Sequence, residues 1–273
     1  MAEDLDGKTP SDLPSDPWRA LRRHTAARIA LGRSGDALPT RHLLDFQLAH
    51  ARARDAVHLD FDSAALAAGL ASSLPSLACV TVRSAAPDRA TYLQYPDLGR
   101  RLNPDDLPLL RRGDYDAVFV LADGLSARAV HDHAAAMLTA TVESLPGWKF
   151  APVVLAHQAR VALGDGIAVA LGAALVVMLI GERPGLSAAD SLGAYLTFGP
   201  RSGLQNADRN CVSNIRPDGL AIPLAARKLA FLMAEARRLK LSGVGLKDDV
   251  PAELLGPEPV KATLENATMR KES

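Results

Sequence analysis

Two apolar runs decide the fold: Asp116–Ala122 (DAVFVLA) and Ala174–Ile180 (ALVVMLI). Each has the length of one strand and is rich in β-branched residues, so both predict strands buried at the centre of a sheet. Asp123-Gly124 ends the first run, and Ser126 caps a helix directly after it. A strand followed by a helix, repeated along the chain, predicts a parallel sheet covered on both faces.

The alternation extends over most of the chain. Further strands are predicted at Ala78–Arg83, Thr91–Tyr95 and Ala151–Ala156. Further helices are predicted after Gly164-Asp165-Gly166, from Ser187 with Asp190 at a capping-box spacing, and from Pro223 to Leu239 ahead of Gly243. The expected fold is therefore α/β, Rossmann-like and doubly wound, with a mainly parallel sheet.

The first part of the chain reads as helical. Asp16 and Pro17 predict a helix start, with Trp18, Leu21, Thr25 and Ile29 along one side. A second helix, capped by Thr40, is expected through His58, and Asp62 or Ser63 opens a third.

These patterns divide the chain into four parts. They are a disordered tail (1–16), a small helical N-terminal domain (17–73), an α/β domain (74–250) and a polar C-terminal tail (251–273).

Composition restricts the class of protein. Lys+Arg and Asp+Glu each number 31 among 273 residues, which argues against a nucleic-acid binder and suits a subunit that lives in a complex. Cys79 and Cys211 are the two cysteines, so a disulfide framework is not expected. The expected location is a reducing compartment, the cytoplasm. We find neither a signal peptide nor a run long and apolar enough to span a membrane.

Parallel sheets bind ligands at the carboxyl ends of their strands. Three such ends can be read here: Asp123-Gly124, His157-Gln158 and Gly181–Gly185 (GERPG). The last places a carboxylate and a guanidinium in a stiff loop. On the fold alone, two interpretations of this segment are equally supported: a ligand-binding loop and an ordinary turn with solvated charges.

Three other features are weaker as sites. Gly164-Asp165-Gly166 lacks the third glycine of a dinucleotide motif, because Val169 stands there, and a helix start is the favoured interpretation. His131 and His133 point to different faces of one helix, so no metal site is predicted and His133 is expected to be a hydrogen-bonded packing residue. Cys211 is expected to be buried and inert rather than a reactive thiolate.

Four segments, in order along the chain, resemble the small subunit of ethanolamine ammonia-lyase. With the weaker similarity around them they span about residues 17 to 245. The segments are Arg28–Arg33 (RIALGR), Phe46–Val57 (FQLAHARARDAV), Gly181–Leu186 (GERPGL) and Asp208–Ile215 (DRNCVSNI).

The resemblance implies a subunit of an adenosylcobalamin-dependent carbon–nitrogen lyase that converts ethanolamine to acetaldehyde and ammonia. In that family a large subunit binds the substrate, and adenosylcobalamin lies at its interface with the small subunit. The family's small-subunit cofactor contacts map to Val161, Glu182 and Cys211. Catalytic residues are not expected in this chain. The expected assembly is a hetero-oligomer with the large subunit, located in the cytoplasm either free or inside a bacterial microcompartment.

Two other functions stay open on the residues alone. One is a stand-alone nucleotide-dependent enzyme on a Rossmann-like sheet, against which the incomplete glycine motif counts. The other is a non-catalytic assembly or microcompartment-targeting protein, suggested by the polar head and the first helix.

Overall fold

The computed structural model describes residues 18–22, 24–25 and 27–251 of the chain. Its six strands are β1 (Cys79–Arg83), β2 (Tyr115–Ala122), β3 (Val153–His157), β4 (Ala173–Gly181), β5 (Leu192–Phe198) and β6 (Asn210–Ile215). Its α-helices are α1 (Arg19–Arg22), α2 (Thr40–His58), α3 (Ser63–Ser73), α4 (Arg89–Gln94), α5 (Ala127–Glu143), α6 (Leu163–Leu171) and α7 (Ile222–Leu239). Short 3-10 turns lie at Leu98–Arg100, Pro104–Leu109, Asn206–Asp208 and Gly243–Gly245.

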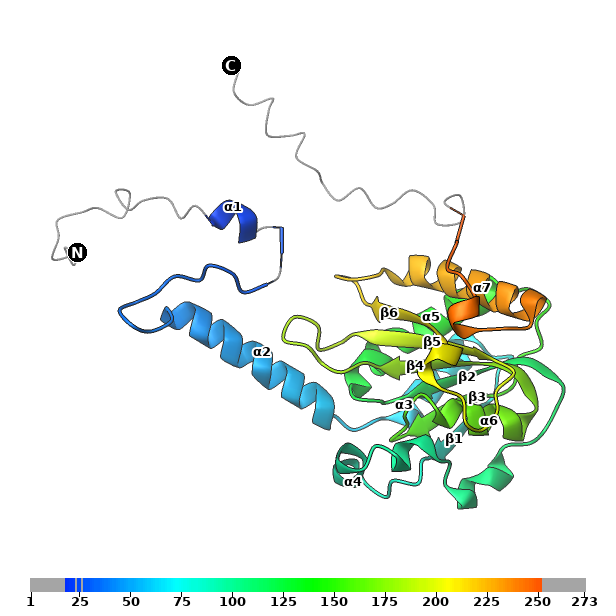
Figure 1. Cartoon of the computed structure of the whole chain (residues 1–273). Helices are drawn as coiled ribbons and strands as arrows, with labels where there is room; N and C mark the ends of the chain where they lie inside the picture. The colour runs from blue at the N-terminus through cyan, green and yellow to red at the C-terminus, as the bar shows by residue number, and fades with distance from the viewer. Residues whose placement is uncertain (1–17, 23, 26, 252–273) are drawn as a thin grey trace.

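The strands form one mixed sheet in the order β1-β3-β2-β4-β5-β6 (Figure 1). The first four of these run parallel, whereas β5 pairs antiparallel with β4 and β6 antiparallel with β5. The α/β class is confirmed, and the sheet is parallel in four of its strands. The antiparallel pair was not predicted, and it leaves the short strand β6 at one edge of the sheet.

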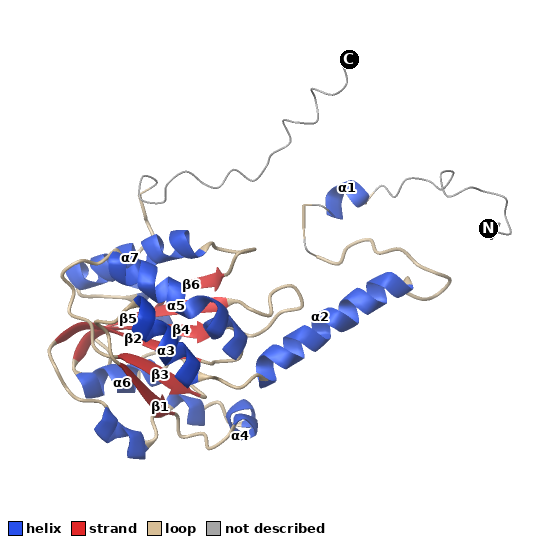
Figure 2. Ribbon diagram, turned by 180° about the vertical axis from the view of Figure 1, so that it is seen from behind, coloured by secondary structure: helices blue, strands red, loops and turns tan. Residues whose placement is uncertain are grey.

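Strand β2 explains why the sheet is covered on both faces. Successive side chains of a strand point to opposite faces. Phe119 and Leu121 therefore pack with α3, α5 and α7, while Val118 and Val120 pack with α6 on the other side. All four side chains are buried, which accounts for the continuous apolar run in the sequence. Figure 2 shows the helices around the sheet.

Caps that were read from the sequence hold several helices in place. The Asp62 side chain accepts a hydrogen bond from Ala65 N (2.9 Å) at the start of α3, and Ser126 accepts one from Ala129 N (3.3 Å) at the start of α5. The prediction of α2 is confirmed at both ends, with Pro39 rather than Thr40 at the cap position.

The strand predicted at Thr91–Tyr95 is wrong. These residues belong largely to helix α4, because the Asp88 side chain caps the segment by accepting from Thr91 N at 2.7 Å. Short apolar runs with β-branched and aromatic residues are compatible with either structure, and here the cap decides.

The helix predicted from Ser187 is also wrong. Gly185 and Ala188 instead form a tight two-way backbone pairing, and the chain runs on into strand β5. Asp190, read as the partner in a capping box, points to side chains of other elements. Tertiary contacts have thus overridden a local pattern.

The predicted first helix is much shorter than expected. Asp16 and Pro17 lie outside the described residues, and the helix that follows covers only Arg19–Arg22. The side chains of Trp18, Leu21 and Ile29 are all exposed. Without a packed apolar face, a helix of this length has little to stabilise it.

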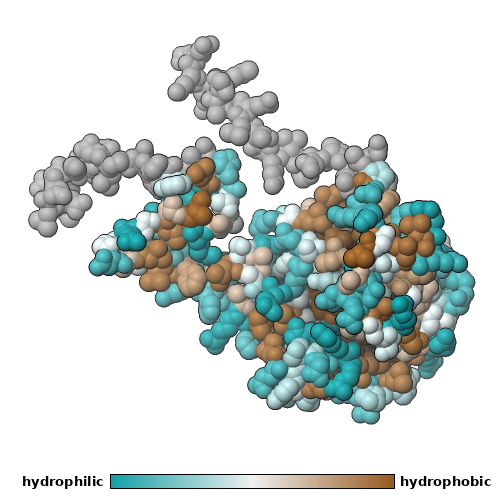
Figure 3. Space-filling view, viewed as in Figure 1, coloured by the Kyte–Doolittle hydropathy of each residue, from teal (hydrophilic) through white to brown (hydrophobic). Residues whose placement is uncertain are grey.

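Helix α2 extends away from the α/β body (Figure 1). Ala56 is its buried residue, whereas Leu43, Leu44, Phe46 and Leu48 are all exposed. Figure 3 shows hydrophobic side chains on this projecting part of the molecule. Large apolar side chains on an isolated helix are typical of a surface that another chain covers.

The two predicted tails, residues 1–16 and 251–273, lie outside the described residues except for Pro251. Within the part of the chain that is described, no helix combines the length and the hydropathy needed to cross a bilayer.

Candidate functional site

Polar residues gather where the parallel strands end. Asp123 follows β2, His157 closes β3, and Glu182 follows β4. All three strands run in the same direction, so these residues lie along one edge of the sheet. The structure thus places the three strand ends that were read from the sequence side by side.

A cavity of about 410 Å³ opens between the loops after β2, β3 and β4. Its lining combines charged, aromatic and apolar side chains with backbone. The lining residues are Tyr92, Gly124, Leu125, Arg160, Val161, Ile180, Gly181, Glu182, Arg183 and Tyr195. Of the three predicted cofactor contacts, Val161 and Glu182 therefore meet at one cavity.

Two glycines allow the loops after β2 and β4 to approach closely. A Cβ on Gly181 would lie 2.0 Å from the Ser126 carbonyl oxygen, and one on Gly124 would lie 2.3 Å from the Gly181 oxygen. Gly124 also has a positive φ of 53°, and Leu125 N donates to Gly181 O at 2.9 Å. The wall of the cavity beside Glu182 is therefore fixed by backbone contacts.

The Glu182 carboxylate is held by one of its oxygens. Oε2 accepts hydrogen bonds from the Ser191 hydroxyl (2.5 Å) and from Asn214 N (3.1 Å). Oε1 accepts no hydrogen bond from the described residues. A fixed carboxylate with one free acceptor can bind a donor such as an amide N–H.

Val161 follows β3 and is half-buried beside the apolar core under α6. Its carbonyl oxygen accepts a hydrogen bond from Gly164 N at 3.2 Å, within the turn that leads into α6. Val161 thus gives the cavity an apolar wall on a fixed backbone.

Cys211 does not line this cavity, and the expectation that it is buried is wrong, because its side chain is exposed on strand β6. It lies on β6 directly across from Tyr195 of β5. The pKa of the Cys211 thiol is raised by partial desolvation and by the nearby Glu182 carboxylate, while the neighbouring Tyr195 hydroxyl acts in the opposite direction. Because Tyr195 lines the cavity, Cys211 stands one side chain behind it, as a neutral thiol near neutral pH.

Asp123 forms a buried charged pair below the cavity. It lies 3.0 Å from Arg89 Nη1 and accepts backbone hydrogen bonds from Gly124 and Ala159. Burial nevertheless raises the pKa of Asp123 to about 6, against the opposite effect of Arg89 and the backbone donors. Asp123 was identified as a strand end in the sequence, but its partner Arg89 was not.

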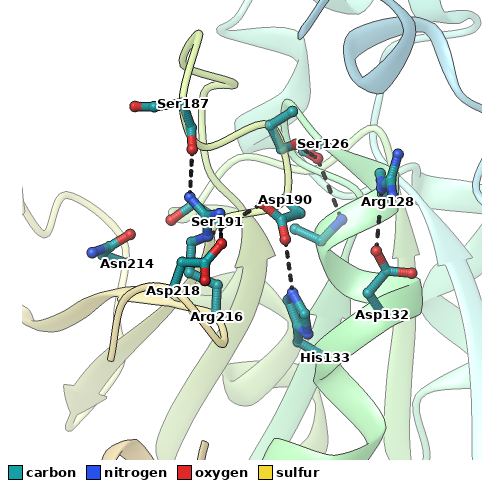
Figure 4. A network of polar contacts seen from close by, with 12 residues as sticks. Ser126, Arg128, Asp132, His133, Ser187, Asp190, Ser191, Asn214, Arg216 and Asp218 are labelled. Atoms are coloured by element: carbon teal, nitrogen blue, oxygen red, sulfur yellow. Dashed lines mark hydrogen bonds and ion pairs between the residues drawn. The ribbon is translucent and has the colours of Figure 1, made fainter. Parts of the chain in front are cut away.

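The loop after Glu182 is fastened from two sides (Figure 4). Asp190 lies 3.5 Å from His133 Nε2 on α5 and 3.3 Å from Arg216 Nε beyond β6. Arg216 also donates to the Ser187 carbonyl at 2.7 Å, and Ser126 donates to the Ala189 carbonyl at 2.8 Å. His133 is buried in this packing as expected, but the expected hydrogen bond is not found, because its Nε2 has no hydrogen-bond partner among the described residues. The other contacts hold the loop that carries Glu182.

Gly164-Asp165-Gly166 forms the first turn of α6, which begins at Leu163. A Cβ on Gly164 would lie 2.8 Å from the side chain of Met178, so this glycine allows helix and strand to pack closely. Asp165 is buried against Arg209. Packing and an ion pair thus account for the motif, and they count against a dinucleotide site there.

The two histidines of α5 contact different parts of the protein. His131 accepts a hydrogen bond from Asp62 N (3.0 Å), whereas His133 faces Asp190. Among the residues whose positions are described, no cluster of His, Cys, Asp and Glu has the arrangement of a metal site.

Comparison with known proteins agrees with the resemblance seen in the sequence. The family model described as "Ethanolamine ammonia-lyase light chain (EutC)" matches residues 15–247. An ethanolamine ammonia-lyase small subunit of Pseudomonas putida is 51% identical over 276 aligned positions, covering 98% of this chain and 100% of its own length. The proteins of the same name from Pseudomonas fluorescens and Azotobacter vinelandii are 54% and 55% identical, over 92% and 88% of this chain and 93% and 91% of their own lengths.

Proposed function

Because the chain belongs to the ethanolamine ammonia-lyase light-chain family, we propose that it supplies part of an adenosylcobalamin site at the border with the large subunit. The complex is then a carbon–nitrogen lyase that acts on ethanolamine, while this chain contributes binding residues and no catalytic group. The main support is that Val161 and Glu182 line one cavity, with Cys211 directly behind Tyr195.

The donor and acceptor set of the cavity fits this cofactor. The corrin ring carries amide side chains, and Glu182 Oε1 offers them a free acceptor on a carboxylate that is otherwise held in place. A cavity of about 410 Å³ can enclose only part of so large a molecule. The remainder is left to the large subunit, as expected for a site shared between two chains.

Adenosylcobalamin, when bound, supplies radical chemistry through its weak cobalt–carbon bond. The residues of this chain have simpler tasks. Glu182 accepts a hydrogen bond and so orients the cofactor, and Val161 excludes water from one side. Tyr195 forms the opposite wall, with Cys211 beside it on β6.

The exposed apolar side chains of helix α2 favour the proposal that this chain binds a large partner subunit. Its exposed leucines and phenylalanine would be covered on assembly, and its few contacts with the α/β body leave it accessible. We therefore propose that residues 17–73 serve mainly in assembly of a hetero-oligomer, and that residues 74–250 face the cofactor. Helix α3 joins the two parts, since Leu66 and Leu70 belong to the core of the α/β body.

The cytoplasm, inside or outside a protein microcompartment, is the proposed location. The alternative of a targeting or assembly subunit rests mainly on residues 1–16, which lie outside the described residues. The exposed apolar side chains of α2 fit an assembly role as well, and the cavity lined by Val161 and Glu182 favours cofactor binding.

The test compares this chain alone, the large subunit alone and the assembled complex. We expect tight binding of adenosylcobalamin and release of ammonia from ethanolamine only with the complex. Binding is measured by equilibrium dialysis with absorbance detection, and ammonia with a coupled assay. Robust turnover by this chain alone, or equal cobalamin affinity of the large subunit with and without it, would contradict the proposal.

A further inference from the structure

Arg160 differs from other arginines in the interior of the α/β body. Arg89, Arg209 and Arg216 are each buried or half-buried, and each lies within 3.3 Å of an aspartate oxygen. Arg160 is half-buried as well, but it forms no ion pair with any described residue. Its Nε is fully buried and has no hydrogen-bond partner there, as is also true of Arg89 Nη2 and Arg216 Nε, so the missing ion pair is what distinguishes Arg160. A half-buried guanidinium that lines a cavity and lacks a carboxylate partner can pair with an anionic group of a ligand bound there.

The position of Arg160 is fixed by its surroundings. Its guanidinium carbon lies 4.5 Å from the centre of the Tyr92 ring, and its backbone N donates to Gly99 O at 2.7 Å. Tyr92 is completely buried, and its hydroxyl donates to the Ala159 carbonyl at 2.9 Å. A Cβ on Gly99 would clash with Tyr92 and touch Arg160 Cγ, so this glycine leaves room for the stack. The guanidinium is thus held in place before any ligand arrives.

The charges around the cavity leave a positive excess. Arg160 and Arg183 line it together with a single carboxylate, Glu182. That carboxylate is already engaged through Oε2 by Ser191 and Asn214 N. The lower pair, Arg89 and Asp123, is neutral as a unit when Asp123 is ionised. An anionic group on the ligand would therefore find Arg160 available.

We propose that Arg160 binds the phosphodiester of the cofactor's nucleotide loop, and so selects cobalamins over corrinoids that lack this group. The inference rests on the proposed function. The corrin side chains are uncharged amides, whereas the phosphodiester carries the negative charge that a guanidinium binds best. Stacking on Tyr92 leaves the edge of the guanidinium free for such hydrogen bonds.

The test uses the assembled complex and three probes: adenosylcobalamin, adenosylcobinamide phosphate and adenosylcobinamide. The last two share the corrin amides and differ in the phosphate. Arg160→Gln should weaken the affinity for the two phosphate-bearing probes roughly ten- to a hundred-fold and leave the affinity for adenosylcobinamide within about two-fold. Arg160→Lys keeps the charge and should fall between wild type and Arg160→Gln. Arg112→Gln, which removes an exposed arginine near the opposite end of the sheet, should change none of the three affinities.

Two results would overturn the inference while leaving the proposed function intact. One is an equal loss of affinity for all three probes, which would show that Arg160 contacts corrin amides or only shapes the cavity. The other is an unchanged affinity for adenosylcobalamin in a folded, assembled Arg160→Gln variant. A wild-type complex that binds none of the probes would instead overturn the proposed function, and the inference with it.

Discussion

Arg209 and Asp165 form a bidentate ion pair inside the protein, with Nη1 2.7 Å from Oδ1 and Nη2 2.6 Å from Oδ2. Their side chains are 3% and 8% exposed. The pair joins the first turn of α6, which follows Val161, to the residue before β6, which carries Cys211. It therefore fixes two of the predicted cofactor contacts relative to each other.

Removal of one partner should strongly destabilise the chain. Arg209→Met leaves the Asp165 carboxylate buried and unpaired, which is expected to lower the free energy of unfolding by about 3–5 kcal/mol. The measurement is urea unfolding followed by circular dichroism. As a control, Asp97→Asn breaks the exposed pair with Arg101 and should change stability by less than ~1 kcal/mol. A similar small effect at Arg209 would refute the structural role assigned here.

Glu182→Ala should weaken adenosylcobalamin binding by the assembled complex roughly ten- to a hundred-fold, the range for a hydrogen bond to a charged group. Ser191→Ala is the matched control, because it removes one internal bond of Glu182 and keeps the free Oε1. We expect a smaller loss of affinity for this control. Unchanged affinity of a folded Glu182→Ala complex would exclude the proposed contact.

Cys211 should behave as a neutral packing residue. Its raised pKa keeps the thiol protonated near neutral pH, so alkylation by iodoacetamide at neutral pH should be slower than that of a cysteine in an unfolded peptide. The measurement uses a Cys79→Ser variant, in which Cys211 is the one remaining thiol that iodoacetamide can alkylate. Cys211→Ser should retain substantial turnover in the complex. Fast alkylation at pH 7, combined with loss of turnover in a variant that still binds cobalamin, would identify a reactive thiolate instead.

Asp123 should make stability depend on pH. Its pKa is about 6 in the folded chain and ~3.9 when unfolded, so the folded state holds the extra proton between these values. Stability should therefore fall as pH rises from about 4 to 6 and level off above that. Between pH 5 and pH 7.5 the loss due to this group is about 1 kcal/mol. Parallel unfolding of wild type and Asp123→Asn isolates it, and an identical pH dependence of the two would contradict the assignment.

The apolar surface of α2 should be needed for assembly. Leu44 and Leu48 are one helical turn apart and 58% and 51% exposed. Replacing both with Glu should abolish or greatly weaken association with the large subunit, as measured by size-exclusion chromatography, while the melting temperature of this chain stays nearly unchanged. The double replacement by Met keeps the surface apolar and should assemble normally. Normal assembly of the Glu variant would locate the contact elsewhere.

The sequence predicts the centre of the fold well because burial leaves a direct pattern. Strands β2 and β4 are buried on both faces, so nearly all of their residues are apolar. Ser126 and Asp62 similarly mark helix starts through local hydrogen bonds. In each case the signal and the structure lie within a few residues of one another.

The rest depends on contacts between distant segments. Ser187 and Asp190 have a capping-box spacing, yet Asp190 pairs with His133 and Arg216, so no helix forms. Tyr195 reaches the cavity because β5 turns back beside β4, a pairing that no local pattern signals. Arg160 stands next to Val161 in the sequence, but its significance appears only when its lack of a carboxylate partner is seen.

The end of the sheet at β6 has a consequence for solubility. An open sheet edge can template strand addition by another molecule and so begin aggregation. Strand β6 is short, is paired with β5 through an irregular register, and exposes polar side chains such as Ser213 and Asn214. The backbone N–H of Asn214 already donates a hydrogen bond to Glu182 Oε2. The interactions that build the cofactor-facing loop therefore also make this edge a poor template for aggregation.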